Sequence, residues 1–369
     1  MENTPSEFPD SRQLDLNRTR WEGRIVSEGG FVQFSCGWCL KNNVVKNNGG
    51  KKMEWTKKGI LIKTEDLNAN WAASHMQMPT PYRVNADIIR LYFSVRDRDC
   101  KSHPVYADIN SHNFNILSVH TEPLLELGKT GTFDDCGITF SSCVEFNGKL
   151  YMYYIGWNKE AVLPYTLSIG LAISGDGGMT FQKISEGPVM DRDCECPYFN
   201  TAPYVLREND GLRMWYVYCT EWQYNPNDGY VPAYLIRSAF SSDGIHWKRD
   251  RGGGVNCIGY KNIHEAIGRP CVYKGNGMDY MWYSYRDTKD FRRNKKNAYM
   301  IGFAVSENGK EWIRKDECVG IGKSENGWDS EMMCYASVME NTSDLVMFYN
   351  GNEHGKYAIG YAVCKKEDL

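Results

Sequence analysis

The chain has 369 residues, with 43 Lys and Arg against 46 Asp and Glu and a formal net charge of −3. This balance argues against a strongly basic nucleic-acid binder or a polybasic membrane binder, and no apolar run approaches the roughly 18 residues of a membrane span. The polar residues 1–23 show no secretory-signal pattern and the 13 cysteines are an odd number, so we expect a cytoplasmic protein with mostly free thiols. The 24 Tyr, 11 Trp, 14 Phe and 35 Gly are typical of a β-rich chain.

The N-terminal part is predicted to comprise an extension, residues 1–50, and one outlying strand. The segment GGKKMEWTKKGILI around Trp55 reads like NGKEWIRKDECVGI around Trp312. The last repeat of the chain ends without its fourth strand. We therefore expect residues 51–57 to pair with the strand at residues 359–363 and to close the structure into a ring.

From residue 71 onward, a unit built around an aromatic strand recurs five times. The centres are 61 to 67 residues apart, in RLYFS at Tyr92, YMYYIG at Tyr153, RMWYVY at Trp215, YMWYSY at Trp282 and VMFYNG at Phe348. A strand of the IGLAIS kind follows in the last four units, and in three of them an Asp-Gly or Asn-Gly turn leads to a further aromatic. Such units are typical of propeller blades.

These repeats predict an all-β fold, a five-bladed β-propeller with four-stranded antiparallel blades, over residues 51–369. The blades are expected at about 71–118, 133–184, 195–250, 263–315 and 329–363, with 51–57 completing the last.

The starts of the first strands and the ends of the second strands must share one face of such a ring, and pockets form where they converge. We expect the catalytic groups among the carboxylates there: Asp135, Glu195, Glu265 and Glu331. The predicted substrate-binding residues are His75, Gln77, Arg96, Asp97, Trp157, Asn158, Arg269, Arg286, Asp329, Asn350 and His354. Paired carboxylates with Trp platforms suit chemistry at a glycosidic bond, because one acid protonates the leaving oxygen.

Two short motifs resemble known carbohydrate-active enzymes. ECP at Glu195 resembles the acid/base motif of glycoside hydrolase family 32, and GWDSEM…YNGN…IGYA resembles family-43-like propellers. The resemblance extends to the related family 130 and implies that Asp135 orients and tunes while Glu195 is the acid. The first blade departs from these families, since SHMQMP has His75 and Gln77 where they carry an Asp. This departure points to phosphate or a sugar acceptor in place of water, with Arg96, Arg269 and Arg286 holding a phosphate or a carboxylate.

The sequence thus leaves two classes of function open. The first is a carbohydrate-active enzyme (hydrolase, phosphorylase or transglycosylase) of intracellular glycan or polysaccharide metabolism, acting on a carbohydrate or sugar phosphate. The alternative is a non-catalytic propeller that binds glycans or partners. We expect no cofactor and no metal, because CGWC at residues 36–39 lacks a second pair at zinc spacing. The basic FRRNKKN at residues 291–297 is interpreted as a solvated loop.

Overall fold

The computed structural model describes residues 52–250, 259, 261, 264–275 and 277–369. The predicted extension at residues 1–50 and the CGWC motif at residues 36–39 lie outside the described residues.

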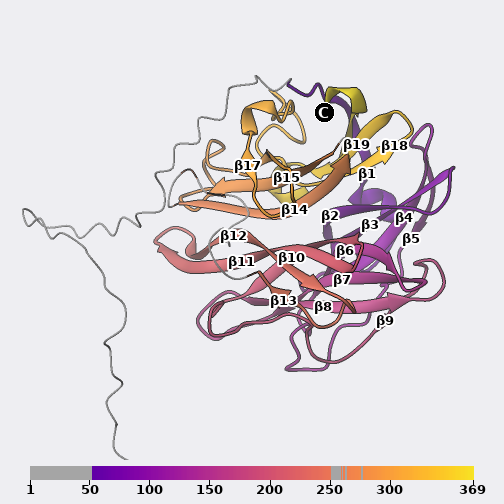
Figure 1. Ribbon diagram of the computed structural model, residues 1–369. Helices are drawn as coiled ribbons and strands as arrows, with labels where there is room; N and C mark the ends of the chain where they lie inside the picture. The colour runs from indigo at the N-terminus through magenta and orange to yellow at the C-terminus, as the bar shows by residue number, and fades with distance from the viewer. Residues whose placement is uncertain (1–51, 251–258, 260, 262–263, 276) are drawn as a thin grey trace, which may run out of the picture. The chain divides into compact units, whose positions relative to one another are not determined.

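The described chain forms five antiparallel sheets of four strands each, which follow one another along the sequence (Figure 1). The first blade contains β2 (Ser74–Arg83), β3 (Ile88–Arg96), β4 (Ser102–Asn110) and β5 (Ile116–His120), and the second contains β6 (Ile138–Phe146), β7 (Lys149–Asn158), β8 (Thr166–Ser174) and β9 (Gln182–Lys183). The third contains β10 (Asn200–Glu208), β11 (Gly211–Asn225), β12 (Gly229–Ser241) and β13 (Lys248–Arg249). The fourth contains β14 (Glu265–Gly275), β15 (Met278–Asp287), β16 (Met300–Ser306) and β17 (Ile313–Arg314). The fifth combines β18 (Cys334–Asn341), β19 (Asp344–Asn350) and β20 (Ala358–Lys365) with β1 (Thr56–Lys63). The predicted all-β, five-bladed propeller is confirmed.

Helical structure is limited to four short pieces in the described residues: η1 (Thr64–Leu67), η2 (Asp316–Cys318), α1 (Asn352–Gly355) and η3 (Lys366–Asp368). None of the helices in this part of the chain is long and apolar enough to cross a membrane.

The N-terminal strand closes the fifth blade, as predicted, but at a shifted position. β1 is Thr56–Lys63 instead of residues 51–57, and it pairs antiparallel with β20 from Thr56 opposite Val363 to Lys63 opposite Ala358. The shift arises because Met53 and Trp55 do not belong to the strand: both are buried in the apolar core beside the fourth blade, where the Trp55 ring meets Trp282 edge-on. In every blade after the first, the outer strand begins directly after such an aromatic residue, as β17 does after Trp312.

In the first three blades, an aromatic side chain of the second strand hydrogen-bonds to a turn of the next blade. The acceptors are backbone carbonyls of the Ser-x-(Asp/Asn)-Gly turns that the sequence repeats. Tyr92 Oη donates to Gly178 O (2.8 Å), Tyr153 Oη to Gly244 O (2.8 Å) and Trp215 Nε1 to Gly309 O (3.1 Å). A Cβ at position 178 would lie 2.0 Å from Tyr92 Oη, so this turn requires glycine for close approach as well as for its φ of +84°.

The inner strand of every blade changes register with its neighbour, as at a β-bulge. In four of the five strands a non-glycine residue at this point has a positive φ: Met78 (61°), Ala202 (45°), Arg269 (53°) and Tyr335 (57°). Such a conformation costs on the order of 1–3 kcal/mol and persists where the surroundings enforce it, often at a functional site. All four residues line the same cavity.

Candidate functional site

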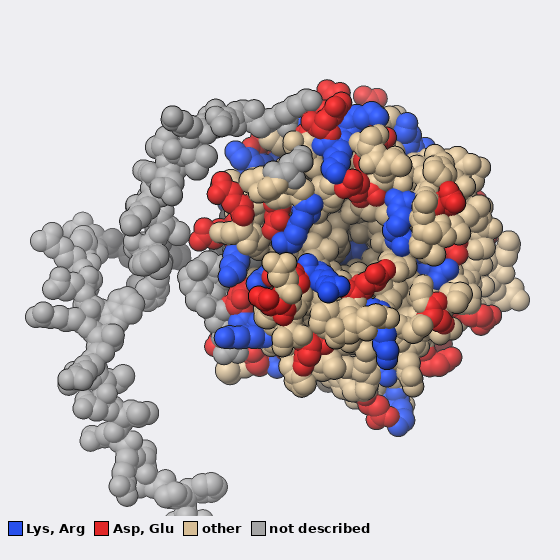
Figure 2. Space-filling view, turned by 45° about the vertical axis from the view of Figure 1, so that its right-hand side comes forward, with Lys and Arg blue, Asp and Glu red and all other residues tan. Residues whose placement is uncertain are grey.

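A cavity of about 440 Å³ lies where the starts of the inner strands and the ends of the second strands converge. This is the size range of small-molecule sites. Figure 2 looks onto a face of the protein that is hollowed near its centre, with Lys and Arg side chains around the hollow. The described lining comes from all five blades, from Gln77 in the first to Tyr335 and His354 in the fifth.

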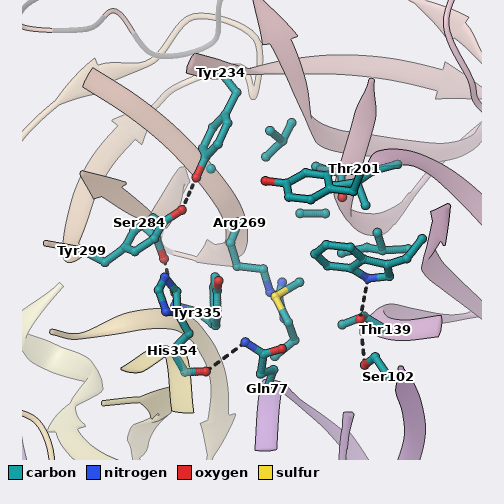
Figure 3. A pocket seen from close by; sticks show the side chains of 18 of the residues that line it. Gln77, Ser102, Thr139, Thr201, Tyr234, Arg269, Ser284, Tyr299, Tyr335 and His354 are labelled. Atoms are coloured by element: carbon teal, nitrogen blue, oxygen red, sulfur yellow. Dashed lines mark hydrogen bonds between the residues drawn. The ribbon is translucent and has the colours of Figure 1, made fainter. Parts of the chain in front are cut away.

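The wall of this central cavity is largely aromatic, with small hydroxyl groups between the rings. Its aromatic residues are Trp157, Tyr165, Phe199, Tyr234, Phe291, Tyr299 and Tyr335. Trp157 Nε1 donates to Thr139 Oγ1 (2.9 Å), which donates to Ser102 Oγ (3.0 Å), so the indole is held in one orientation (Figure 3). Flat rings that are fixed in this way can stack on the apolar face of a sugar while the hydroxyls bind its polar edge.

Gln77 connects two charged or titratable neighbours at the cavity. Its Nε2 donates to the backbone oxygen of His354 (3.0 Å), and its Oε1 accepts from Arg96 Nη2 (3.1 Å). Figure 3 shows the first of these bonds. Gln77 is only 6% exposed, so these bonds fix the first-blade side of the cavity.

The cationic groups of the lining are four arginines, Arg96, Arg269, Arg286 and Arg292, and the described lining contains no Asp, Glu or Lys. Arg286 is buried, and its Nε donates to Tyr299 Oη (3.1 Å) while its guanidinium lies 4.0 Å from the centre of the Phe291 ring. The cavity is therefore positively charged within a mostly apolar wall.

Two histidines near the cavity are held neutral at ordinary pH. Burial, with the charges of Arg292, Arg286 and Arg96, lowers the pKa of His354 from 6.5 to about 3. Burial and then Arg96 lower the pKa of His75 to about 4. At pH 7 neither imidazole carries the extra proton that a general acid would transfer. Each neutral ring can still donate one hydrogen bond and accept another.

These shifts predict a loss of stability in mild acid. As the pH falls below about 6.5, the two imidazoles bind protons in the unfolded chain but not in the folded one, so the free energy of unfolding falls with pH until the folded pKa values near 4 and 3 are reached. Urea midpoints should therefore drop between pH 7.5 and pH 5 in the wild type, and less in a His75→Gln, His354→Gln double variant.

The range from pH 7.5 to 5 isolates the histidines because ordinary carboxylates stay largely ionised above pH 5. A matched control is His112→Gln, since His112 is exposed. Equal midpoint changes in the wild type and the double variant would contradict the assignment.

Six of the residues predicted from the sequence line the cavity: Gln77, Arg96, Trp157, Arg269, Arg286 and His354. The others that were assigned to substrate binding are not among the described lining residues. His75 Nδ1 bonds to Ser74 Oγ (2.8 Å), and Asp97 accepts from the backbone N–H groups of Asp99 and Lys101 in its own turn. Asn158 donates to Thr132 O and to Asp135, while Asn350 is fully buried between the fifth and first blades.

Two of the acids predicted at the mouth, Glu265 and Asp329, form ion pairs inside their own blades. In the last four blades, an acid before or at the start of the inner strand pairs with a basic residue next to or in the outermost strand. These pairs are Asp134–Lys183 (2.6 Å), Asp193–Arg249, Glu265–Arg314 (2.7 Å) and Asp329–Lys57 (2.6 Å). Each pair ties the entry loop of a blade to its edge, which directs the carboxylate along the blade and away from the axis.

None of the four carboxylates that were predicted to be catalytic is among the described lining residues. Glu265 is 7% exposed and bound by both Arg314 nitrogens, Glu331 pairs with Lys295 at 2.7 Å, and Glu195 is exposed to solvent. Asp135 is nearest in sequence to the cavity, because its neighbour Cys136 lines it.

Asp135 is held as a carboxylate. It accepts hydrogen bonds from the Gly131 N–H (2.8 Å) and from Asn158 Nδ2 (2.9 Å). Burial by itself would raise the pKa of Asp135, but the bonds from Gly131, Cys136 and Asn158 outweigh it and lower the pKa. Asp135 is thus suited to stabilise positive charge or to accept a proton, and not to donate one.

The sequence interpretation missed several lining residues. Phe291 and Arg292 belong to the basic segment interpreted as a solvated loop, and both line the cavity. The interpretation was wrong for Phe291, which is buried, whereas Arg292 is exposed to solvent. Tyr234 and Tyr299 stand two residues before Ile236 and Ile301 of the third-strand motif. This recurring tyrosine was a usable signal, but it lies in or next to the third strand, whereas the predicted mouth comprised first-strand starts and second-strand ends.

The comparisons with known proteins give two close relatives in sequence. Both are from Mycobacterium tuberculosis, "Uncharacterized protein MT1551" of strain CDC 1551 and "Uncharacterized protein Rv1502" of strain H37Rv. Each is 33% identical over 316 residues, which cover 85% of this chain and 100% of the relative. No family model matches the chain.

Solved structures with the same fold include glycoside hydrolases. One titled "Glycoside hydrolase" has a TM-score of 0.66 at 17% identity and covers 85% of this chain and 92% of its own. A thermostable family-43 glycoside hydrolase has a TM-score of 0.57 at 17% identity, with 81% and 91% covered. The GH32 beta-fructofuranosidase of Bombyx mori has a TM-score of 0.53 at 14% identity, with 81% and 63% covered. At these identities the likeness establishes the fold, which is the propeller of families 43 and 32; the family 130 resemblance stays a prediction.

Proposed function

The chain belongs to the family of the two mycobacterial proteins, and we propose that it is a carbohydrate-active protein that binds a saccharide in the central cavity. The observation that carries this proposal is the axial cavity of about 440 Å³ with ordered aromatic rings and hydroxyl groups from several blades. The shared propeller fold of the glycoside hydrolases supports the choice of a sugar as ligand. The cytoplasmic location expected from the sequence is part of the same proposal.

The enzymatic form of this function is chemistry at a glycosidic bond, as a hydrolase, phosphorylase or transglycosylase. Of the proposed acid/base residues, the surroundings of Asp135 support it best, because it is ionised and adjacent to the lining residue Cys136. A carboxylate there would stabilise the positive charge that develops on the sugar ring in the transition state. The structural support for Glu195, Glu265 and Glu331 is weaker, since Glu195 is exposed and the other two form ion pairs.

A second candidate function is saccharide binding without turnover. It is favoured by one specific observation: the described lining residues include no carboxyl group to protonate a leaving oxygen. The two forms share the binding site and differ in whether a bond is broken.

The test is a panel of oligosaccharides, aryl glycosides and sugar phosphates, assayed for binding by calorimetry and for turnover with and without phosphate. Trp157→Ala should weaken binding of any saccharide ligand by about tenfold, because a stacked ring contributes roughly 1–3 kcal/mol. If the protein is an enzyme, Asp135→Asn should lower kcat by about a hundredfold or more.

One matched control and one further test variant accompany these variants. Tyr224→Ala removes an aromatic ring that is 67% exposed and does not line the cavity, so saccharide binding should be unchanged. Glu195→Gln tests the acid implied by the family 32 resemblance. Full saccharide affinity in Trp157→Ala would refute the cavity as the binding site. Binding without turnover across the panel would select the non-catalytic function.

A further inference from the structure

One of the buried charged groups of the central cavity is Arg269, from the bulge of the fourth inner strand. Its side chain is only 2% exposed. The guanidinium crosses to the first blade, where Nη2 donates to Thr80 Oγ1 (3.0 Å), and Nη1 donates to the backbone oxygen of Pro270 (3.3 Å). Both acceptors are neutral, so neither hydrogen bond pairs the charge of this buried arginine with a carboxylate.

Arg269 also carries an unsatisfied donor. Its Nε is buried and has no hydrogen-bond partner in the described part of the chain. A buried N–H without an acceptor costs about 1–3 kcal/mol, and more when the group is charged. The described chain supplies no acceptor for this N–H, and the residue is additionally held at a φ of +53°.

A second arginine, Arg96, lines the same part of the cavity. Arg96 donates to Gln77 and Arg269 to Thr80, so both guanidinium groups approach β2 within three residues of each other. Arg286 is different: its Nε and Nη2 are occupied by Tyr299 Oη and Pro232 O, so it supplies charge and leaves fewer free donors. Uncompensated positive charge in a largely apolar wall favours an anion strongly, because the local dielectric is low.

We propose that the central cavity selects anionic saccharides and that their acidic group, a carboxylate or a phosphate, binds at Arg269 with Arg96 beside it. An oxyanion is the ligand that offers charge-assisted acceptors to a guanidinium. The saccharide part of this inference rests on the proposed function, whereas the anion part rests on the arginines alone.

The experiment uses the full chain and two charged sugar probes, glucuronate and glucose 6-phosphate, each compared with neutral glucose. Inorganic phosphate serves as a sugar-free probe. Affinities are measured by calorimetry and by the shift in thermal unfolding that a ligand of the folded state produces. At least one anionic probe should bind in preference to glucose. Arg269→Met, which keeps the length of the side chain but removes the charge, should weaken that binding by about tenfold to a hundredfold.

Two further variants separate a binding role from a structural one. Arg269→Lys keeps the charge without the planar fork and should bind with intermediate affinity. Arg207→Met changes an exposed arginine outside the cavity and should leave anion binding intact. In anion-free buffer Arg269→Met should be at least as stable as the wild type, because an unpaired buried charge is removed.

The outcomes are distinguishable. Preference for glucuronate or for glucose 6-phosphate identifies the acidic group. Binding of inorganic phosphate that depends on Arg269, with no saccharide bound, supports the anion site and rejects the proposed carbohydrate function. Saccharide binding that is equal for neutral and charged probes, or anion binding that survives in Arg269→Met, overturns the inference.

Discussion

Deleting residues 1–63 is expected to abolish soluble folding of the propeller. This change removes β1, which supplies the outer strand of the fifth blade, together with Met53 and Trp55 in the core beside Trp282. The full length of β20 would then be an unpaired edge over exposed apolar surface, a template for aggregation. The measurement is the yield of monomer in size-exclusion chromatography and the presence of a cooperative thermal transition.

A matched deletion of residues 1–49 keeps β1, Met53 and Trp55, and it should retain both the monomer peak and the transition. A single substitution should disturb the same contact less severely than the deletion. Gly320→Ala would place a Cβ 1.8 Å from the backbone oxygen of Met53, and it should lower the melting temperature without preventing folding. A cooperative monomer after deletion of residues 1–63 would refute the closure by β1.

Replacing Asn350 by leucine is expected to destabilise the ring by about 3 kcal/mol or more, since each buried polar group left without a partner costs about 1–3 kcal/mol. Asn350 is fully buried and joins the last blade to the first. Its Oδ1 accepts from the Met78 N–H (3.0 Å), and its Nδ2 donates to Met76 O (2.6 Å) and Ala358 O (3.2 Å). Urea unfolding should show a lower midpoint with an unchanged slope.

Asn352→Leu is the matched control for this variant. Asn352 also bonds to backbone groups, of Glu331, Met332 and Gly327, but it is partly exposed, so water can replace its bonds. Its loss should cost less than about 1.5 kcal/mol. If Asn350→Leu unfolds at the same urea concentration as the control, the amide does not contribute to closing the ring.

The equivalent contacts in other blades use smaller side chains. Ser94 Oγ accepts from the Phe140 N–H (2.8 Å) between the first and second blades, and Ser284 Oγ accepts from the Tyr335 N–H (2.8 Å) between the fourth and fifth. Only at the closure does this position combine an acceptor with two donated bonds. The sequence analysis assigned Asn350 to substrate binding because it lies at a second-strand end, which is where the closing contact is also made.

The architecture of this protein was determined by its sequence alone. Aromatic strands at intervals of 61 to 67 residues, with Gly-containing turns between them, are local features whose spacing leaves little alternative to five blades. The last repeat lacks an outer strand and the segment around Trp55 matches one, so the closure could also be predicted; only its bounds were shifted, because Trp55 packs in the core before the strand begins.

The lining of the cavity was decided by the tertiary structure. Alignment of repeats places a residue along a strand, but the direction of its side chain depends on the register of pairing and on local backbone conformation. A basic residue at the edge of each of the last four blades turns Asp134, Asp193, Glu265 and Asp329 away from the axis. The left-handed bulge turns Arg269 toward it, where the proposed anion would bind. Both effects join residues that are far apart in the sequence, and for that reason the repeats could indicate the mouth of the propeller but not the charge inside it.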